Sequence, residues 1–400
     1  MITRIKEKEV QSLLKQFLVV AIIGPRQCGK TTIAKKTRID KKLTSLYFDL
    51  ESPADFTRFH DPEYFLQSIQ AQMVIIDEVQ RKPELFFILR SLVDKNKKKG
   101  KYLLLGSASP HLVRGISETL AGRIAYCEVA PFNLIEVYKK QTDLNKLWFR
   151  GGFPDAWLSK SETMWFTWMD NFFRTFIERD LNNLFGVNFS SPLMYKLWRM
   201  LAHFHGQAWN AQTFAKGLDV SAPTVNKYID YLEGAFMIRK LPAFYTNAKK
   251  RIVKSPKIYI RDSGLLHYLI DITKSKNVIF NPAVGYSWEG YAIEQILQLV
   301  PNHIKAYYYR THDGSEMDLL LVNGLVPIAC IELKTTNNPQ LTRSFYESVN
   351  DLKCLNNFVV TPFQEVSYKA EKNITICGLH DFLLNFLPKL LKIRGTLIKK

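Results

Sequence analysis

A phosphate-binding loop is the chemical motif that stands out first in this sequence. Residues 24–31 read Gly-Pro-Arg-Gln-Cys-Gly-Lys-Thr, which fits the spacing G-x-x-x-x-G-K-[ST]. Glycines at both ends of the loop allow a tight turn in which successive amide N–H groups point at phosphate oxygens. The dipole of the following helix adds positive potential at the same place. The residues expected at the phosphates are Gly24, Pro25, Arg26, Gln27, Cys28, Gly29, Lys30, Thr31 and Thr32.

Two side chains of this loop have expected chemical roles. The Lys30 ammonium would reach the β- and γ-phosphates, and the Thr31 hydroxyl would hold Mg²⁺. The apolar run 17–23 before the loop predicts a buried strand, and residues 32–36 predict a helix. The motif requires this strand–loop–helix context, so we expect ATP and Mg²⁺ to bind here.

Two acids follow a second apolar run. Residues 73–76 are Met-Val-Ile-Ile, and Asp77 and Glu78 come directly after them. A carboxylate at the carboxyl end of a buried parallel strand reaches the ligand edge of the sheet. We therefore expect Asp77 to hold Mg²⁺ through water and Glu78 to act as general base toward the attacking water.

Further catalytic candidates follow the apolar run 102–105. Ser107 lies at its end, where the hydroxyl would sense the γ-phosphate or position the water; a turn-forming serine is the alternative. Arg123 is the candidate for stabilising transition-state charge, in cis or from a neighbouring subunit, and Arg114 competes for that role. For both arginines an ordinary surface position is the alternative. An arginine supplied in trans would require a homo-oligomer.

Together these motifs resemble those of one family, the bacterial and archaeal AAA+-type ATPases that carry a C-terminal domain of unknown function. The matching segments are residues 24–32, 75–80, 120–123, 151–154 and 176–181. The resemblance covers nearly the whole chain and implies an AAA+-like fold with nucleotide chemistry. Cys28 departs from the family pattern, in which a small aliphatic residue is usual; inert packing and sensitivity to oxidation are the two interpretations.

The middle of the chain has the pattern of a winged helix-turn-helix. Residues 207–218 and 220–232 predict two helices around a turn, and residues 236–241 and 257–260 predict the strands of a wing. Thr224, Asn226 and Lys227 on the second helix are the candidates for DNA contact. No acid lies between Glu233 and Asp262, but eight basic residues do: Arg239, Lys240, Lys249, Lys250, Arg251, Lys254, Lys257 and Arg261. A lid or packing module is the alternative to a DNA-binding role.

The C-terminal region has the acid pattern of a restriction-endonuclease-like fold. Asp318 lies in the apolar run 315–322, and Glu332-x-Lys334 ends the run 328–334. Alternation along a strand puts Glu332 and Lys334 on the same side. We expect Asp318 and Glu332 to hold a second Mg²⁺, Lys334 to activate water or stabilise charge, and Glu289 to complete the cluster from a helix. A structural ion network, or a domain that binds without cutting, is the alternative.

Composition sets limits on class and location. The chain of 400 residues has 55 Lys and Arg against 37 Asp and Glu, a net charge of +18, which raises the question of a nucleic-acid partner. Five cysteines lie far apart without a C-x-x-C pair, which argues against disulfides and zinc. No apolar run approaches the ~20 residues of a membrane span, and the first residues lack a signal-peptide core. We therefore expect a cytoplasmic protein without a membrane partner.

These observations predict an α/β protein with four segments. They are a P-loop ATPase domain with a parallel sheet (1–150), a helical linker (151–190), a winged helix-turn-helix (191–275) and a nuclease-like domain (280–400). The function expected is a Mg²⁺-dependent ATPase that couples nucleotide state to a DNA-associated or defence-type activity. The alternative is a nucleotide-dependent regulatory switch that binds a protein partner, uses no nucleic acid and has an inactive nuclease-like domain.

Overall fold

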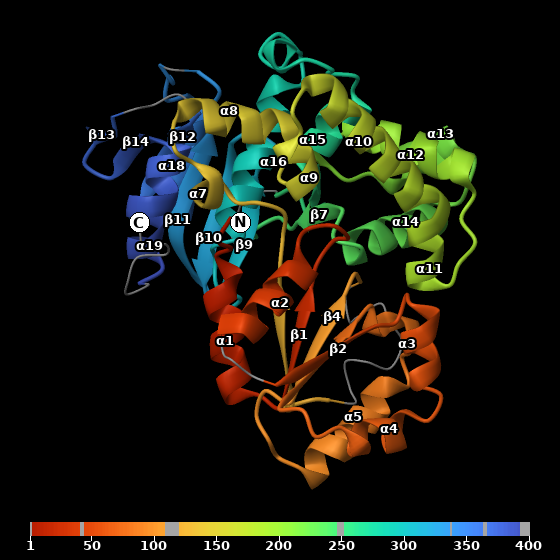
Figure 1. Cartoon of the computed structure of the whole chain (residues 1–400). Coiled ribbons are helices and arrows are strands. Elements are labelled where there is room, and N and C mark those ends of the chain that lie inside the picture. Colours follow the sequence, from red (N-terminus) through yellow and green to blue (C-terminus); the bar gives the residue numbers. More distant parts are fainter. Residues whose placement is uncertain are drawn as a thin grey trace. The chain divides into compact units, whose positions relative to one another are not determined.

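The chain divides into two units, each assembled from separate stretches of sequence (Figure 1). The computed structural model describes residues 2–40, 44–108, 120–245, 252–336, 338–362 and 366–392. The first unit comprises Met1–Phe132, Thr175–Phe189 and Asp230–Met237, and the second comprises Asn133–Arg174, Ser190–Ile229 and Ile238–Lys400.

Five parallel strands form the sheet of the first unit, in the order β2-β3-β4-β1-β5. Strands β3 and β4 are buried along their whole length. A parallel sheet covered on both faces requires such nearly continuous apolar strands. The predicted parallel α/β sheet is therefore confirmed. Its strands are β1 (Val19–Ile23), β2 (Ser45–Asp49), β3 (Met73–Asp77), β4 (Tyr102–Gly106) and β5 (Ile124–Glu128).

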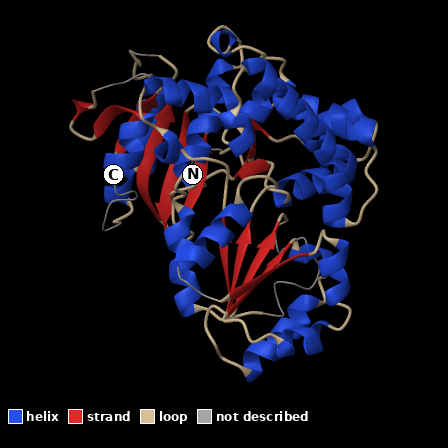
Figure 2. Ribbon diagram, in the orientation of Figure 1, coloured by secondary structure: helices blue, strands red, loops and turns tan. Residues whose placement is uncertain are grey.

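Helices cover both faces of this sheet (Figure 2). Val19 and Ala21 of β1 join the apolar cluster that includes α5, whereas Val20 and Ile22 join the cluster that includes α1 and α2. The alternation of a strand thus supplies apolar side chains to both cores. The helical elements of this unit are α1 (Lys6–Gln16), α2 (Lys30–Asp40), α3 (Pro53–Arg58), α4 (Pro62–Ser68), η1 (Val79–Arg81), α5 (Leu85–Lys95), η2 (Phe176–Asp180) and α11 (Leu181–Phe185).

The second unit contains a six-stranded sheet of order β13-β14-β12-β11-β10-β9. Strands β9, β10 and β11 are antiparallel neighbours, whereas β12 runs parallel to β11. The runs that contain Asp318 and Glu332 form β10 and β11, as the pattern predicted. The strands of this sheet are β9 (Ile304–Arg310), β10 (Glu316–Asn323), β11 (Val326–Leu333), β12 (Asn357–Thr361), β13 (Tyr368–Glu371) and β14 (Ile374–Gly378).

The second unit also contains a three-stranded antiparallel sheet of order β6-β8-β7. These strands are β6 (Gln207–Ala208), β7 (Ile238–Leu241) and β8 (Lys257–Ile260). The helical elements that lie wholly or mostly in this unit are α7 (Leu134–Val137), α8 (Gln141–Arg150), α9 (Pro154–Leu158), α10 (Glu162–Thr175), α12 (Ser191–His203), α13 (Ala211–Leu218), α14 (Ala222–Gly234), α15 (Ser263–Leu269), η3 (Ser275–Asn277), α16 (Val284–Leu297), α17 (Arg343–Leu352), α18 (Leu379–Asp381), η4 (Phe382–Phe386) and α19 (Leu387–Leu390).

The Gly151-Gly152 pair packs against the start of α15. The Asp262 carboxylate accepts the backbone N–H of Gly152 at 2.8 Å and that of Leu265 at 2.9 Å. A Cβ on Gly264 would lie 2.1 Å from the Arg150 carbonyl oxygen, so a residue without a side chain is needed where α8 meets α15. Within the described residues, no helix has the length and apolar character that crossing a membrane requires.

Candidate functional site

Strand β1 and helix α2 frame the phosphate loop. Strand β1 ends at Ile23 and α2 begins at Lys30. The backbone φ is +151° at Gly24 and +99° at Gly29, values that residues with a side chain rarely adopt. A Cβ on Gly24 would also lie 2.0 Å from the carbonyl oxygen of Val129. The backbone itself therefore requires glycine at both positions.

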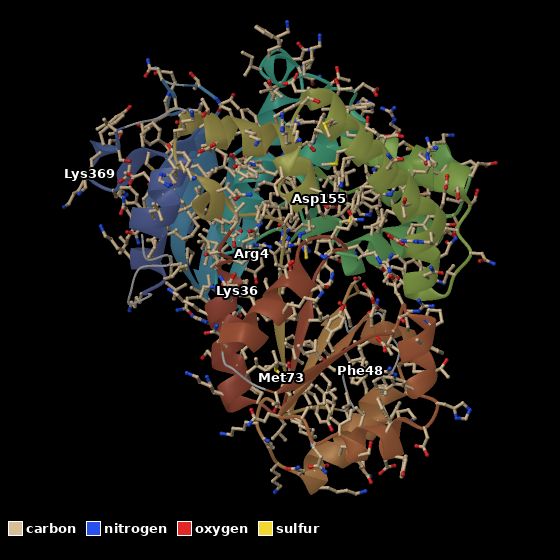
Figure 3. The ribbon with its side chains drawn as sticks, viewed as in Figure 1. Arg4, Lys36, Phe48, Met73, Asp155 and Lys369 are labelled. Atoms are coloured by element: carbon tan, nitrogen blue, oxygen red, sulfur yellow. The ribbon has the colours of Figure 1, made fainter. Side chains whose placement is uncertain are left out.

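The phosphate loop is supported by Arg4, which is labelled in Figure 3. The Arg4 guanidinium donates to the carbonyl oxygens of Cys28 at 2.8 Å and Ala130 at 2.7 Å. The buried Cys28 thiol donates to the carbonyl of Val129 at 3.2 Å, a contact that suits inert packing. Sequence reasoning missed Arg4, because it lies 24 residues before Cys28 and outside any motif.

Lys30, Ser107 and Glu78 form one chain of hydrogen bonds. The Lys30 ammonium donates to the Ser107 hydroxyl at 3.1 Å, and this hydroxyl donates to the Glu78 carboxylate at 3.2 Å. Lys30 is 5% exposed and also donates to the carbonyls of Gly24 at 3.0 Å and Pro25 at 2.8 Å. Strand β4 lies between β1 and β3 and therefore carries Ser107 to a position between the loop lysine and the strand-end acid.

Thr31 and Asp77, the two expected magnesium ligands, are hydrogen-bonded to each other. The Thr31 hydroxyl donates to Asp77 Oδ2 at 2.8 Å, and the Tyr47 hydroxyl donates to the same oxygen at 2.7 Å. The other oxygen, Oδ1, accepts the backbone N–H of Glu78 at 2.9 Å. Burial and the adjacent Asp77 carboxylate raise the pKa of Tyr47. Tyr47 stays a neutral donor, and sequence reasoning missed it because a tyrosine in an apolar strand predicts only packing.

Glu78 is held in an unusual backbone conformation beside several polar groups. Its φ is +53°, in the left-handed region, and its carboxylate also accepts from Gln80. Burial raises the pKa of Glu78, although the charges of Lys30 and Arg26 oppose this shift. A carboxylate whose pKa is raised toward neutrality is a better proton acceptor at physiological pH than an ordinary glutamate.

Arg26 connects the phosphate loop to the segment 176–181. Its guanidinium donates to Asp180 of η2 at 2.6 Å and to Glu51, and it lies 4.0 Å from Glu78. The side chains of Arg26 and Asp180 are 14% and 6% exposed, so solvent screens this pair only weakly. Asp180 is separated from Arg26 by 154 residues, and its motif was interpreted only as part of a linker helix.

Other predicted residues are not drawn into this cluster. Arg123 donates to both carboxylate oxygens of Asp94, at 2.5 and 3.0 Å, and no described contact joins it to Lys30 or Glu78. Arg114, the competing candidate, lies outside the described residues. Gln27 and Thr32 are exposed at the loop and the first turn of α2.

The four residues of the predicted carboxylate cluster all belong to the second unit. Lys334 lies 2.7 Å from Glu332, and Asp318 Oδ2 accepts the backbone N–H of Leu333 at 2.8 Å. Burial and the carboxylates of Glu332 and Glu289 raise the pKa of Asp318 well above its usual range. The four predicted residues are thus near one another, but within the described parts of the chain no three acidic, histidine or cysteine side chains are arranged to hold a metal ion.

Several basic residues of the predicted wing are paired inside the second unit. Glu294 accepts from Arg239 and from Arg261, the latter at 3.1 Å, and Lys257 lies 2.8 Å from Glu289. Asn226 accepts from the Trp209 indole at 2.9 Å, and Thr224 contacts Ser221 at 2.8 Å. Lys249, Lys250 and Arg251 lie outside the described residues, and Lys254 is exposed. The expected cluster of free positive charge is therefore reduced, because three of its members neutralise buried carboxylates.

Three sequence families match successive parts of the chain. Residues 16–138 match the AAA domain, residues 141–276 match a domain of unknown function (DUF8612), and residues 284–382 match another (DUF4143). The chain is 39% identical over 363 residues to the uncharacterized protein Rv2008c of Mycobacterium tuberculosis, which covers 90% of this chain and 80% of that protein. The same values hold for the uncharacterized protein Mb2031c of Mycobacterium bovis.

The chain belongs to the family of these mycobacterial proteins. The N-terminal part of this family member is an AAA-type P-loop ATPase domain, as the motifs predicted. An uncharacterized protein of Haemophilus influenzae is more distant, at 25% identity over 324 residues that cover 70% of this chain and 79% of that protein. Among solved structures, the Walker-type ATPase of Pyrococcus abyssi covers 66% of this chain and 94% of its own, at 14% identity and a TM-score of 0.46.

The Arg26–Asp180 pair should contribute measurably to the stability of this family member. Replacing Arg26 by Met removes one of the cations that pair with the buried Asp180 carboxylate. We therefore expect the free energy of unfolding to fall by about 2 kcal/mol or more. Urea unfolding of the Arg26→Met, Asp180→Asn and doubly substituted proteins would measure the coupling between the two side chains.

The matched control for this pair is Arg58→Met. Arg58 is 58% exposed and lies 3.7 Å from Asp55, and exposed pairs of this kind contribute less than about 1 kcal/mol. An effect of Arg26→Met no larger than that of the control would contradict the structural role assigned to this pair.

Proposed function

We propose that this protein binds ATP with Mg²⁺ and hydrolyses it at the cluster around Lys30, Asp77 and Glu78. The observation that carries this proposal is the convergence of the Thr31 hydroxyl and the chain Lys30–Ser107–Glu78 at the carboxyl ends of β1, β3 and β4. Polar side chains gathered at that edge of a parallel sheet are where ligands of such folds bind.

Each residue has a proposed role in the reaction. Thr31 and Asp77 would hold Mg²⁺, which supplies charge neutralisation at the β- and γ-phosphates. Lys30 binds the phosphates with its ammonium, in exchange for its hydrogen bonds to the loop carbonyls. Glu78 accepts a proton from the attacking water, and Ser107 holds the carboxylate and the water in position. Arg123 stays a proposal for transition-state charge and would have to leave Asp94 to act.

We also propose that the middle of the chain is a winged helix-turn-helix. Support comes from the element order α12, β6, α13, α14, β7, β8 and from the sheet order β6-β8-β7. In this sheet the short strand β6 pairs with β8, one of the two proposed wing strands. Asn210 caps α13 by accepting the N–H groups of Gln212 and Thr213, and Ser221 accepts the N–H of Thr224 in α14. The proposed boundaries stay 1–150, 151–190, 191–275 and 280–400.

The C-terminal region is proposed to be restriction-endonuclease-like. Support comes from the order α16, β9, β10, β11, α17, β12, with β12 parallel to β11 after a helical crossover. Glu289, Asp318 and Glu332 would hold a divalent cation in this domain, and Lys334 would stabilise phosphate charge. Carboxylate oxygens suit Mg²⁺ and Mn²⁺, so the chemistry of these side chains fits such an ion.

ATP hydrolysis should depend on two residues in different ways. Lys30→Ala removes the phosphate contact, so we expect ATP binding itself to be lost. Glu78→Gln removes the proton acceptor, so we expect ATP to bind while turnover falls by about 100-fold or more. Phosphate release and nucleotide binding are the two measurements, and Lys8→Ala is the matched control because Lys8 is exposed on α1. Equal turnover in the Glu78→Gln and unchanged proteins would contradict the assignment of the base.

Two hypotheses describe the activity that is coupled to ATP hydrolysis. The basic composition and the helix-turn-helix order favour a DNA-associated activity, whereas the internal pairing of Arg239, Lys257 and Arg261 favours a switch that binds a protein partner. We propose the DNA-associated activity. We expect duplex DNA to stimulate ATP hydrolysis several-fold and the effect to fall steeply between 50 and 200 mM salt.

The control for this experiment is the Lys30→Ala protein, which should retain salt-sensitive DNA binding without hydrolysis. Absence of both DNA retention and stimulation at low salt would contradict the DNA-associated output and favour the switch.

A further inference from the structure

A lysine from the three-stranded sheet lies among the carboxylates of the C-terminal region. Lys257 of β8 is 2% exposed, and its ammonium lies 2.8 Å from Glu289 Oε1 and 2.6 Å from Glu316 Oε1. Two residues further along β8, the Tyr259 hydroxyl donates to the same Glu289 oxygen at 2.5 Å. Neighbours at i and i+2 share one face of a strand, so β8 turns a single polar face toward these acids.

The other side of the carboxylate cluster has an unused acceptor. Glu332 Oε1 pairs with Lys334 at 2.7 Å, whereas Glu332 Oε2 is buried and has no hydrogen-bond partner among the residues that the structure describes. The whole residue is 7% exposed. A buried carboxylate oxygen without a partner costs free energy unless a cation or a donor satisfies it. The cluster therefore has capacity for one more positive ligand next to Glu332.

We infer that Lys257 is a tethered cation that keeps this cluster closed to divalent metal, and that its removal opens a Mg²⁺ or Mn²⁺ site at Glu289, Asp318 and Glu332. This inference rests on the carboxylate site proposed above. An ammonium is a compact charge with several donors, and a divalent cation needs the same oxygens at shorter distance. Lys257 already occupies Glu289 Oε1, so the two cations compete for one ligand.

The position of Lys257 connects the metal site to the proposed winged helix. Strand β8 is the central strand of the three-stranded sheet, in which Lys257 pairs with Leu241 of β7 and Ala208 of β6. Two glutamates of helix α16 bind side chains of that sheet. Glu289 contacts Lys257 and Tyr259. Glu294 contacts Arg239 and Arg261. A shift of the three-stranded sheet relative to α16 would move the Lys257 ammonium away from Glu289. The affinity of the cluster for metal would therefore depend on the position of this sheet.

Mn²⁺ titration of lysine variants tests this inference without any activity assay. All proteins carry Asp77→Asn, which removes the proposed metal ligand of the nucleotide site, and no nucleotide is added. The fall of the free Mn²⁺ signal in electron paramagnetic resonance measures binding. We expect Lys257→Met to bind one Mn²⁺ at least tenfold more tightly than the protein with Lys257, and Lys257→Met/Asp318→Asn to lose this binding.

The matched control is Lys254→Met, which removes the same charge from an exposed position three residues earlier and should leave Mn²⁺ binding unchanged. If the protein with Lys257 binds Mn²⁺ as tightly as Lys257→Met, and Asp318→Asn abolishes both, the carboxylate site stands and the closing role of Lys257 is wrong. If folded Lys257→Met binds no Mn²⁺, the metal site itself is wrong, while the ATPase proposal is unaffected.

A second variant tests the inference even if Lys257→Met does not fold. Lys257→Met leaves Glu289 and Glu316 without the cation that they share, so circular dichroism with and without Mn²⁺ is used to check that this variant is folded. Glu316→Gln keeps the lysine but removes one of its two carboxylate partners. We expect it to bind Mn²⁺ between threefold and tenfold more tightly than the protein with Glu316, and unchanged affinity in a folded protein would overturn the inference.

Discussion

Burial of three neighbouring parallel strands is the constraint on which the proposed nucleotide site depends. Strands β1, β4 and β3 are covered on both faces, so polar side chains are tolerated only where the strands end. Lys30, Ser107 and Asp77 lie at or just beyond those ends, and parallel direction brings the ends to one edge. Gly24 then allows the chain to turn directly against Val129, which places the loop over the same edge.

Hydrogen bonds of Arg4 to backbone carbonyls and an ion pair of Arg26 connect this local arrangement to the rest of the first unit. Arg4 holds the loop backbone from the N-terminal segment, and Arg26 holds Asp180 in the π-helical turn η2. Both arginines are largely buried, so each replaces several water contacts by charge-assisted hydrogen bonds. The phosphate loop is therefore supported by residues far apart in sequence. A change in the conformation of the loop would alter the Arg26–Asp180 pair at η2.

Local motifs predicted the residues at the centre of the proposed nucleotide site, and distant contacts account for what was missed. Thr31 and Asp77 were predicted because each follows an apolar run at a spacing with a chemical meaning. Tyr47 and Asp180 were missed because nothing near them in sequence indicates their partners. Lys257 was counted among the basic residues between Glu233 and Asp262, since a count of charges does not say which lysine is buried beside Glu289.

The central claim is that the N-terminal domain binds a nucleoside triphosphate through Mg²⁺ at Thr31 and Asp77. Calorimetric titration of ATP into the unchanged protein and into Thr31→Ala, each with Mg²⁺ and with excess chelator, tests it most directly. The account predicts binding that weakens at least tenfold when Mg²⁺ is removed from the unchanged protein and responds little to Mg²⁺ in Thr31→Ala. Equal affinity in all four titrations, or no affinity in any of them, would contradict it.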